Sequence, residues 1–340
     1  MIWIPKPRIT LTTFRVFLLM LASTSLASAA PESLLGDWAL NLDSGEPAWL
    51  SVYDEGGETK ARMRVYVGPE GPYETEVLGE EAIRFTMKPK RLAKGSKVMV
   101  DQVVEVGIKE VGLAGVLVRT PRDESGEERI NFTGKRIPPM PESPPDLSKV
   151  RFGHPISLFN GKDLTGWRPY ENDKINGWSV EGGLLVNSTP KTDFSATGDH
   201  ANLRTEAEFD DFWLHIEFLI EADRNSGVYL RGTYEAQVVD RDSRMQGLQG
   251  VGAIFSRIEP SVNAGRPPGE WQTYDITLVD RHVTVVLNGV KVIDNEPVIG
   301  PTGGAINTDP MAPGPIYPQG DHTAVKYRDI YLAPVIRERD

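Results

Sequence analysis

Apolar and polar residues alternate with a period of two along short stretches of the first third of the chain. This is the period of half-buried β-strands, whose side chains point alternately to the two faces of a sheet. The predicted strands are 49–53, 61–67, 83–87, 98–106 and 115–119. Residues 123–128 are mostly acidic and predict an exposed hairpin tip. Residues 34–137 show no convincing helical period and no catalytic cluster, so they are predicted to form a small antiparallel β-barrel or sandwich.

The same alternation returns with greater regularity beyond residue 151. The predicted strands are 178–186, 212–220, 228–239, 273–279, 283–287 and 324–332. Asn288 and Gly289 suit the left-handed positions of a type I′ turn, so a hairpin is expected there. Strands joined by long irregular loops predict a two-sheet, concanavalin-like jelly roll over residues 151–337. The predicted fold class is therefore all-β.

Two segments lie outside these predicted domains. Residues 1–29 combine basic residues, a short apolar run and the sequence Ala27-Ser28-Ala29, which is the pattern of a cleavable signal peptide. Residues 138–150 contain five prolines, which remove backbone donors and favour an extended linker. The sequence therefore predicts an exported, periplasmic or extracellular protein with two β-rich domains.

Charge and cysteine content exclude several classes of function. The chain has 340 residues and a formal net charge of −11, and the first 29 residues contribute only basic side chains. Such an acidic chain repels phosphate backbones, so nucleic acid is not an expected partner. The absence of cysteine excludes disulfides, thiol catalysis and thiolate metal sites. No segment is apolar over the ~20 residues that a membrane span requires, so membrane insertion is not expected either.

The segment 225–240 carries the most informative polar pattern. Its even positions are mostly apolar and should face the core, namely Val228, Leu230, Tyr234, Ala236 and Val238. Its odd positions should share the opposite face, namely Tyr229, Arg231, Thr233, Glu235 and Gln237. A solvated sheet face requires polar residues in any case. This row, however, offers a ring, a guanidinium, a carboxylate and an amide, which are groups that bind sugars.

A second strand, 212–220, shows the same arrangement. Its apolar residues take the core face and leave Trp213, His215 and Glu217 on the other. If this strand neighbours 225–240 in the sheet, His215 and Glu217 join the same polar surface. An ordinary surface histidine is the alternative.

Several ordered motifs resemble the 3-keto-disaccharide hydrolase domain family, a concanavalin-like jelly roll. The motifs are Leu158-Phe159-Asn160-Gly161-Lys162-Asp163-Leu164-Thr165-Gly166-Trp167, Asn202-Leu203-Arg204-Thr205, the strand 225–240, Pro267-Pro268-Gly269-Glu270-Trp271, Leu287-Asn288-Gly289 and Gln319-Gly320-Asp321-His322. The resemblance runs from about residue 152 to 335 and does not include the N-terminal domain.

The resemblance implies cleavage of glycosides that carry a ketone at carbon 3 of the sugar. A ketone there acidifies the proton on carbon 2, so a base can form an enolate and expel the glycosidic oxygen from carbon 1. Addition of water then gives net hydrolysis. Such a site requires a base, a donor or cation for the enolate oxygen, and an acid for the leaving group. The implied substrate is an oxidised glycoside, which a sugar 3-oxidoreductase acting upstream would supply.

The sequence offers candidates for each of these roles. His322 or Glu235 is the expected base, and Arg231 with Gln237 is expected to hold the enolate oxygen. Asp240 or a bound divalent cation completes the set, although no tight metal-ligand spacing occurs. The further candidates for substrate binding are Tyr229, Glu217, His215 and Gln319.

Two other functions remain open from the residues alone. Direct hydrolysis by two carboxylates would pair Glu235 with Asp240, which requires a bulge because their spacing is odd. A non-catalytic carbohydrate-binding module would instead stack sugars on tryptophans, for which the candidates are Trp167, Trp178, Trp213 and Trp271.

Overall fold

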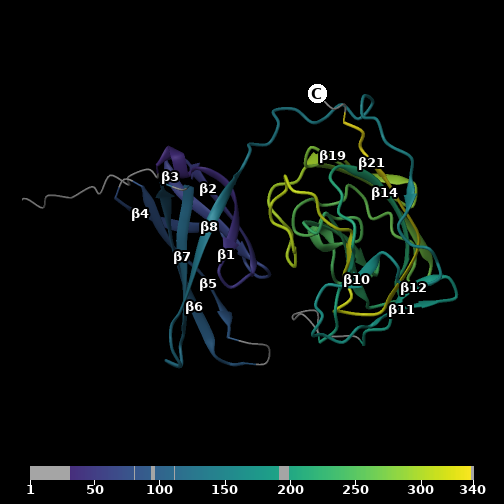
Figure 1. The fold of residues 1–340 in the computed structure, drawn as a ribbon, viewed down its shortest axis with the longest axis horizontal. Coiled ribbons are helices and arrows are strands. Elements are labelled where there is room, and N and C mark those ends of the chain that lie inside the picture. Colours follow the sequence, from purple (N-terminus) through teal and green to yellow (C-terminus); the bar gives the residue numbers. More distant parts are fainter. Residues whose placement is uncertain (1–30, 80, 93–95, 111, 191–198, 338–340) are drawn as a thin grey trace, which may run out of the picture.

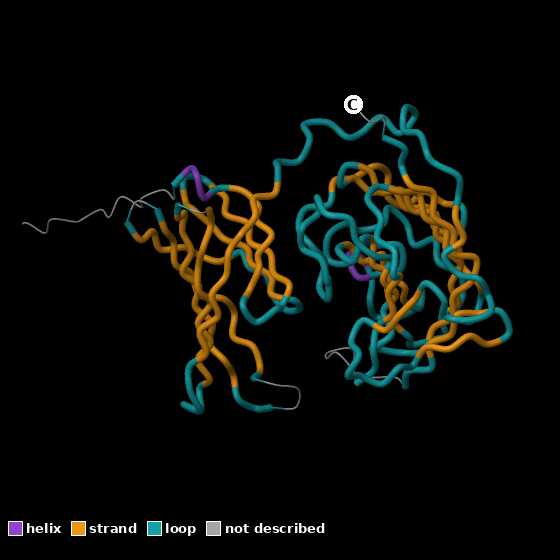
Figure 2. Tube along the Cα trace, in the orientation of Figure 1, coloured by secondary structure: helices purple, strands orange, loops and turns teal. Residues whose placement is uncertain are grey.

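The computed structural model describes residues 31–337 except 80, 93–95, 111 and 191–198. Figure 1 shows two β-rich units side by side, the N-terminal unit in purple to blue and the C-terminal unit in green to yellow. Figure 2 shows that regular structure is almost entirely strand. Two short 3₁₀ turns are also described, η1 (Glu32–Leu34) and η2 (Gly247–Gln249). The all-β prediction is confirmed. The predicted signal peptide lies outside the described residues.

The N-terminal unit is a closed antiparallel barrel. Its described strands are β1 (Gly36–Leu42), β2 (Pro47–Glu55), β3 (Glu58–Val65), β4 (Tyr73–Leu78), β5 (Ala82–Arg91), β6 (Met99–Lys109), β7 (Gly112–Pro121) and β8 (Glu128–Ile137). Each strand pairs with the next, and β8 returns to pair with β1. Inward-facing apolar side chains such as Leu50, Met63 and Phe85 fill the interior. Closure leaves no free sheet edge in the barrel.

The C-terminal unit contains one large and two small sheets. The large sheet has the order β11-β12-β21-β14-β17-β18-β19, with β9 on β21, and the small sheets are β16-β15-β20 and β10-β13. The strands are β9 (Ile156–Ser157), β10 (Trp167–Pro169), β11 (Trp178–Glu181), β12 (Leu184–Asn187), β13 (Leu203–Thr205), β14 (Phe212–Leu219), β15 (Asn225–Leu230), β16 (Tyr234–Val239), β17 (Trp271–Val279), β18 (His282–Leu287), β19 (Val290–Pro297), β20 (Tyr317–Pro318) and β21 (Val325–Pro334).

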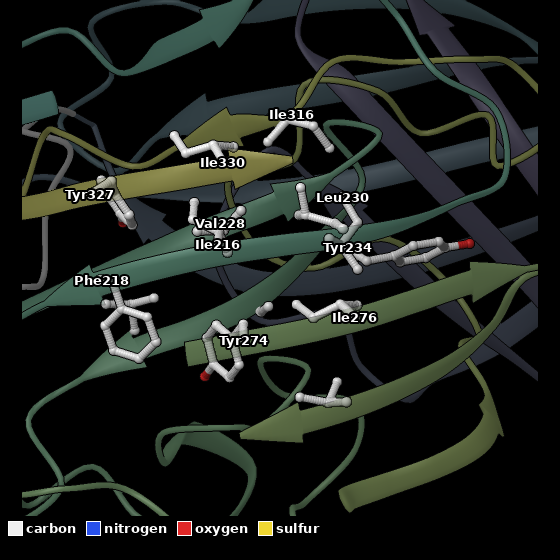
Figure 3. Packing of buried hydrophobic residues seen from close by; sticks show 14 of the residues in the cluster. Ile216, Phe218, Val228, Leu230, Tyr234, Tyr274, Ile276, Ile316, Tyr327 and Ile330 are labelled. Atoms are coloured by element: carbon white, nitrogen blue, oxygen red, sulfur yellow. The ribbon is translucent and has the colours of Figure 1, made fainter. Parts of the chain in front are cut away.

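One core lies between the large sheet and the β16-β15-β20 sheet. Ile216 and Phe218 of β14 pack with Val228 of β15 and Tyr234 of β16, as Figure 3 shows. The even-numbered residues of 225–240 thus face the core as predicted. The predicted hairpin at Asn288-Gly289 also forms, with positive φ at both residues.

Two predicted strands are each a hairpin. Residues 178–186 turn at Gly182-Gly183, where both glycines have positive φ, and form β11 and β12. Residues 228–239 turn at 231–233 and form β15 and β16. The turn places Leu230 opposite Tyr234, so even positions pair with even positions and odd with odd. The prediction that even positions face the core and odd positions face away is therefore correct, although the prediction of one continuous strand over 228–239 was wrong.

The assumption that 212–220 neighbours 225–240 was wrong. Strand β14 pairs with β17 and β21 in the large sheet, whereas β15 pairs with β16 and β20 in the small one. His215 and Glu217 alternate with core residues of β14, so they lie on the outer face of the large sheet. The core separates them from the polar row of the β15–β16 hairpin.

Several bonds connect the two units. Lys135 of β8 pairs with Asp309 at 2.6 Å. The linker segment also contacts the second unit, because Arg281 donates to the carbonyls of Pro138 and Pro139 and Asn295 donates to that of Pro145. Among the described residues, no helix is long and apolar enough to cross a membrane.

Candidate active site

The β15–β16 hairpin brings Tyr229 directly opposite Glu235. Both belong to the odd-numbered row, which faces away from the core. The carboxyl group of Glu235 extends across β15 over Gly227, where a Cβ atom would lie only 2.7 Å from Glu235 Cγ and would overlap the carboxyl oxygen. The missing side chain at position 227 therefore provides the space that Glu235 occupies.

This row is buried rather than solvated, because loops contact it. Glu235 is only 3% exposed, and Tyr229 and Gln237 are also buried. Burial raises the pKa of Glu235 to about 8, a hydrogen bond with Tyr229 opposes the rise, and the charge of Asp321 adds to it. At neutral pH this carboxyl is mostly protonated.

Tyr229 connects Glu235 to the loop at Gly303. The Tyr229 hydroxyl donates its single proton to the carbonyl oxygen of Gly303 at 2.6 Å. The hydrogen bond between Tyr229 and Glu235 opposes the rise in the pKa of the carboxyl, and burial outweighs it. Tyr229 thus lies between Glu235 and Gly303.

The loop after β20 runs along the other side of β15. Gln319 N–H donates to Gly227 O at 2.8 Å, and Ser226 Oγ donates to Gln319 O at 2.7 Å. Further on, Asn225 N–H donates to Thr323 Oγ1, which donates in turn to Asn225 O. These bonds fix residues 319–323 beside Gly227 and hence beside the carboxyl of Glu235.

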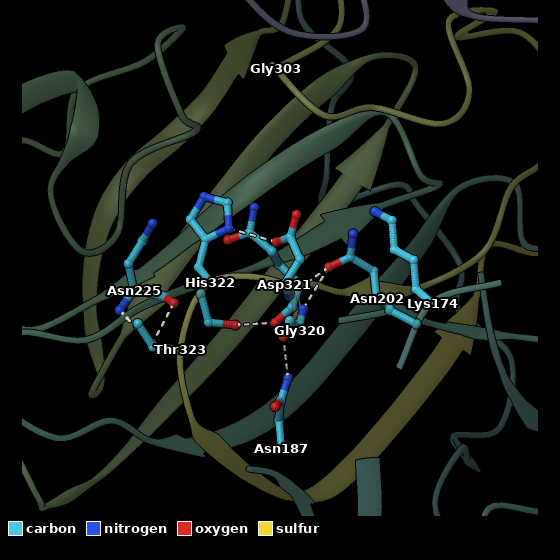
Figure 4. A network of polar contacts seen from close by, with 12 residues as sticks. Lys174, Asn187, Asn202, Asn225, Gly303, Gly320, Asp321, His322 and Thr323 are labelled. Atoms are coloured by element: carbon cyan, nitrogen blue, oxygen red, sulfur yellow. Dashed lines mark hydrogen bonds and ion pairs between the residues drawn. The ribbon is translucent and has the colours of Figure 1, made fainter. Parts of the chain in front are cut away.

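This loop presents an Asp–His pair, shown in Figure 4. His322 Nδ1 lies 2.6 Å from Asp321 Oδ1. Asp321 is buried, whereas the His322 side chain is 13% exposed. A carboxylate that accepts the Nδ1 proton leaves Nε2 as the basic nitrogen of the ring. The structure therefore brings together Glu235 and a loop that carries His322, both of which the sequence singled out.

Asn202 holds this loop in position. Its Oδ1 accepts the N–H groups of Gly320 at 2.6 Å and Asp321 at 3.1 Å, and its Nδ2 donates to the Tyr317 hydroxyl at 2.7 Å. Figure 4 shows Asn202 between Asp321 and Lys174.

The network continues beyond Asn202 to charged residues. The backbone N–H of Asn202 donates to Glu171 Oε2 at 3.0 Å, and Lys174 donates to Glu171 Oε1 at 3.1 Å. Asn202 and Asp321 lie within motifs that support the family resemblance, but sequence reasoning assigned them no role. No sequence signal indicated Glu171 or Lys174.

Arg231 does not join this group. It lies in the turn after β15, with positive φ, and its guanidinium donates to Asp211 at 3.3 Å and to the carbonyls of Pro310 and Ala312. Because the chain reverses between β15 and β16, Arg231 is a turn residue and not a strand residue. Its side chain therefore does not lie beside Tyr229 and Glu235, as its predicted role required.

Gln237 and Asp240 are also engaged elsewhere. Gln237 Nε2 uses one of its two N–H donors for Gln249 O at 3.1 Å. Asp240 accepts the backbone N–H groups of Asp223 and Asp242 at 3.0 Å each. It therefore closes a turn at the end of the hairpin away from Arg231. The side-chain oxygens of Gln237 and Gln319 are both buried, and neither has a hydrogen-bond partner among the described residues.

The remaining candidates form contacts outside the site. Glu217 pairs with Arg328 at 2.7 Å, and a hydrogen bond with Asp275 raises the pKa of His215. Of the tryptophans, Trp167 and Trp178 are buried in the core. His215 and Glu217 thus pair with other residues on the outer face of the large sheet, and they do not share a surface with Glu235 as predicted.

No cluster of three or more His, Cys, Asp or Glu side chains that suits a metal ion is found in the part of the chain that the structure describes. The arrangement at Glu235 is chemically capable of acid–base work, because a buried carboxyl with a raised pKa faces a loop with a partly exposed imidazole that a carboxylate orients.

The C-terminal unit is thus a jelly-roll domain whose smaller sheet carries the buried Glu235 beside the loop of Asp321 and His322. A family model described as a 3-keto-alpha-glucoside-1,2-lyase-like domain matches residues 154–333, just over half of the chain. The chain belongs to this family. The resemblance seen in the motifs is confirmed.

Individual relatives are more distant. A curated protein of Bacteroides thetaiotaomicron named 3-keto-disaccharide hydrolase is 24% identical over 166 residues, which are 41% of this chain and 57% of that protein. The chain therefore spans little more than half the length of this relative.

Solved structures that resemble this chain match just over half of it. Two proteins of Parabacteroides distasonis described as glycosyl hydrolases match with 22% and 26% identity and TM-scores of 0.45 and 0.42. They cover 54% and 58% of this chain and 94% and 93% of their own. SCLam, a non-specific endo-beta-1,3(4)-glucanase from family GH16, matches with 13% identity and a TM-score of 0.31, covering 58% of this chain and 94% of its own.

Proposed function

We propose that the protein cleaves the glycosidic bond of 3-keto glycosides through an enolate at carbon 2. The observation that carries this proposal is the buried carboxyl of Glu235 beside the loop of the Asp321–His322 pair. The family model and the name of the curated relative both support a 3-keto sugar as substrate.

In this mechanism His322 is the base. Asp321 accepts the proton on Nδ1, so Nε2 takes the proton from carbon 2 of the sugar. The electron pair of that C–H bond forms the enolate, whose negative charge resides on the oxygen at carbon 3. Lys174 is the basic side chain of the Asn202 network. It pairs with Glu171 at 3.1 Å, and its ammonium group has further N–H donors, so it is the candidate for stabilising this charge.

Glu235 is the acid. As the enolate collapses, the bond between carbon 1 and the glycosidic oxygen breaks, and Glu235 supplies the proton for the departing oxygen. A carboxyl with a pKa of about 8 is mostly protonated at neutral pH and suits this role. Addition of water across the resulting double bond, with its hydroxyl on carbon 1 and its proton on carbon 2, completes hydrolysis.

Direct two-carboxylate hydrolysis is the second candidate, with a different partner for Glu235. Asp240 is bound to a turn, but Asp321 is close enough for its charge to raise the pKa of Glu235. A protonated carboxyl beside a second carboxyl is also the requirement for cleavage of an unoxidised glycoside.

Incubation of the purified protein with a 3-keto-glycoside and with its unoxidised parent separates the possibilities. Turnover of the keto form alone supports the enolate route, and turnover of the parent supports direct hydrolysis. Binding of sugar without turnover of either indicates a binding module and contradicts both. Glu235→Gln and His322→Asn are the test variants, and His154→Asn, at an exposed position, is the matched control.

Two further parts of the proposal concern the cellular setting. The substrate requires an enzyme that oxidises carbon 3 of a sugar, so a sugar 3-oxidoreductase would act upstream. We also propose that residues 1–29 are a signal peptide that is removed on export. The N-terminal sequence of the mature protein, recovered from the periplasm or medium, should begin near Ala30. An intact N-terminus retained with the membrane would contradict export.

A further inference from the structure

The N-terminal barrel reaches the candidate active site through the residue that follows β3. Tyr66 has a φ of 52°, and its carbonyl oxygen accepts the N–H of Gly304 at 3.0 Å. Gly304 follows Gly303, the acceptor of the Tyr229 hydroxyl. The main chain of the barrel is thus bonded to the loop that accepts the hydrogen bond of Tyr229.

The side chain of Tyr66 enters the same region. It hydrogen-bonds with Tyr317 of β20. The Tyr317 ring packs edge-on against Tyr229, with centroids 5.0 Å apart, and its hydroxyl accepts from Asn202. Asn202 in turn fixes the backbone of Asp321. Tyr66 is therefore two side chains from the Asp–His pair.

An ion cluster holds this part of the barrel against the second unit. Arg257 Nη1 and Nη2 bind the two carboxylate oxygens of Glu70 at 2.6 Å each, and Arg64 Nη2 binds it at 2.7 Å. Burial opposes the ionisation of Glu70, but the hydrogen bonds and charges of the two arginines outweigh it and lower its pKa. Bidentate geometry of this kind fixes orientation as well as distance. The segment 66–70 is thus anchored.

The Tyr66 side chain lies near acidic groups of the candidate site. Burial and the charges of Glu171 and Asp321 raise the pKa of Tyr66, so the phenol is neutral. The residue is nevertheless partly exposed. A neutral phenol offers a sugar an apolar face for its C–H groups and a hydroxyl that both donates and accepts.

We propose that Tyr66 is a sugar-contacting residue, so that the binding site for the carbohydrate is composite and the N-terminal barrel supplies one of its walls. The inference rests on the proposed function for the identity of the substrate. It gives the barrel a role in recognising the sugar, beside the catalytic groups of the jelly roll.

The test is Tyr66→Phe in the full-length protein, measured by steady-state kinetics on a 3-keto-glycoside and by calorimetric titration with the unoxidised disaccharide. Loss of one hydrogen bond to the sugar should raise KM and the dissociation constant by about 10-fold. The value of kcat should change less than twofold, because the hydroxyl does not contact the reacting atoms. Tyr53→Phe is the matched control, since it removes a tyrosine hydroxyl of the same barrel that has no hydrogen-bond partner in the described structure.

The outcomes separate this inference from the proposed function. Unchanged KM and sugar affinity in Tyr66→Phe would overturn the composite site. So would parallel losses of kcat, affinity and urea resistance, which indicate a structural role. If the wild-type protein binds sugar without turnover, the proposed function fails. In that case weaker binding by Tyr66→Phe still supports the composite site, and equal binding refutes it.

Discussion

Replacement of Glu235 by Gln tests whether this carboxyl is protonated in the folded protein at neutral pH. Gln has nearly the same size and keeps an N–H donor for Tyr229, but it cannot ionise. Burial is the main cause that raises the pKa of Glu235 from 4.5 to about 8. In the unfolded chain the group is hydrated, so folding binds a proton at neutral pH.

The size of the effect follows from the two pKa values. A group whose pKa is raised on folding stabilises the protein fully below its unfolded pKa, and this contribution is lost as the pH rises through the folded pKa. For Glu235 the window runs from 4.5 to about 8. Each pH unit within it lowers the free energy of unfolding by about 1.4 kcal/mol. Between pH 5 and pH 7 the wild-type protein should therefore lose about 2–3 kcal/mol relative to Glu235→Gln.

Urea unfolding of both proteins at pH 5, 6 and 7 measures this difference. Other titrating groups are common to both proteins, so their effects cancel. Glu296→Gln, at an exposed position of β19, is the control and should follow the wild-type protein at every pH. The contrary result is that the free energies of unfolding of the wild-type protein and Glu235→Gln differ by the same amount at every pH in this range. That result would show that Glu235 is ionised in the folded state, and its assignment as the acid would fail.

Three other variants or treatments give further expectations. Gly227→Ala should lower the free energy of unfolding by about 1–3 kcal/mol and turnover by at least 10²-fold, because the new methyl group overlaps the carboxyl of Glu235. The double variant Gly227→Ala, Glu235→Ala should recover the stability, and no recovery would refute the overlap. His322→Asn should lower kcat on a 3-keto-glycoside by about 10² with an unchanged melting temperature, and full turnover would exclude His322 as the base. Limited proteolysis should cut first within residues 138–150, where the chain has no strand. The two fragments released should keep the circular dichroism of folded β-structure. Early cleavage inside either sheet region would contradict the two-domain assignment.

Local alternation predicted which face of 225–240 lies toward the core but not the path of the chain. The turn at 231–233 keeps odd positions on one face, so the pattern is the same for one strand or for a hairpin. Treated as one strand, Tyr229 and Glu235 would lie about 20 Å apart. The hairpin makes them neighbours, and this contact creates the acid–base arrangement.

Sheet order and loop packing could not be derived from local pattern. His215 and Glu217 have the same alternation as the polar row, yet they lie on another sheet, because strand neighbours are set by contacts between distant segments. Burial of Glu235 depends on the loops that contain Gly303 and Asp321, and these loops have no periodic pattern. For Tyr66 the relevant contacts come from a different β unit, so the barrel sequence alone carries no signal for it.

The kinetic isotope effect of deuterium at carbon 2 of a 3-keto-glycoside tests whether the protein cleaves its substrate through an enolate. If His322 removes this proton before or as the glycosidic bond breaks, the wild-type protein should turn over the deuterated substrate at a clearly slower initial rate. The unoxidised parent should show no measurable cleavage, since it has no acidic proton at that carbon. Equal rates for labelled and unlabelled substrate, together with turnover of the parent, would contradict the enolate route and favour direct hydrolysis by Glu235 and Asp321.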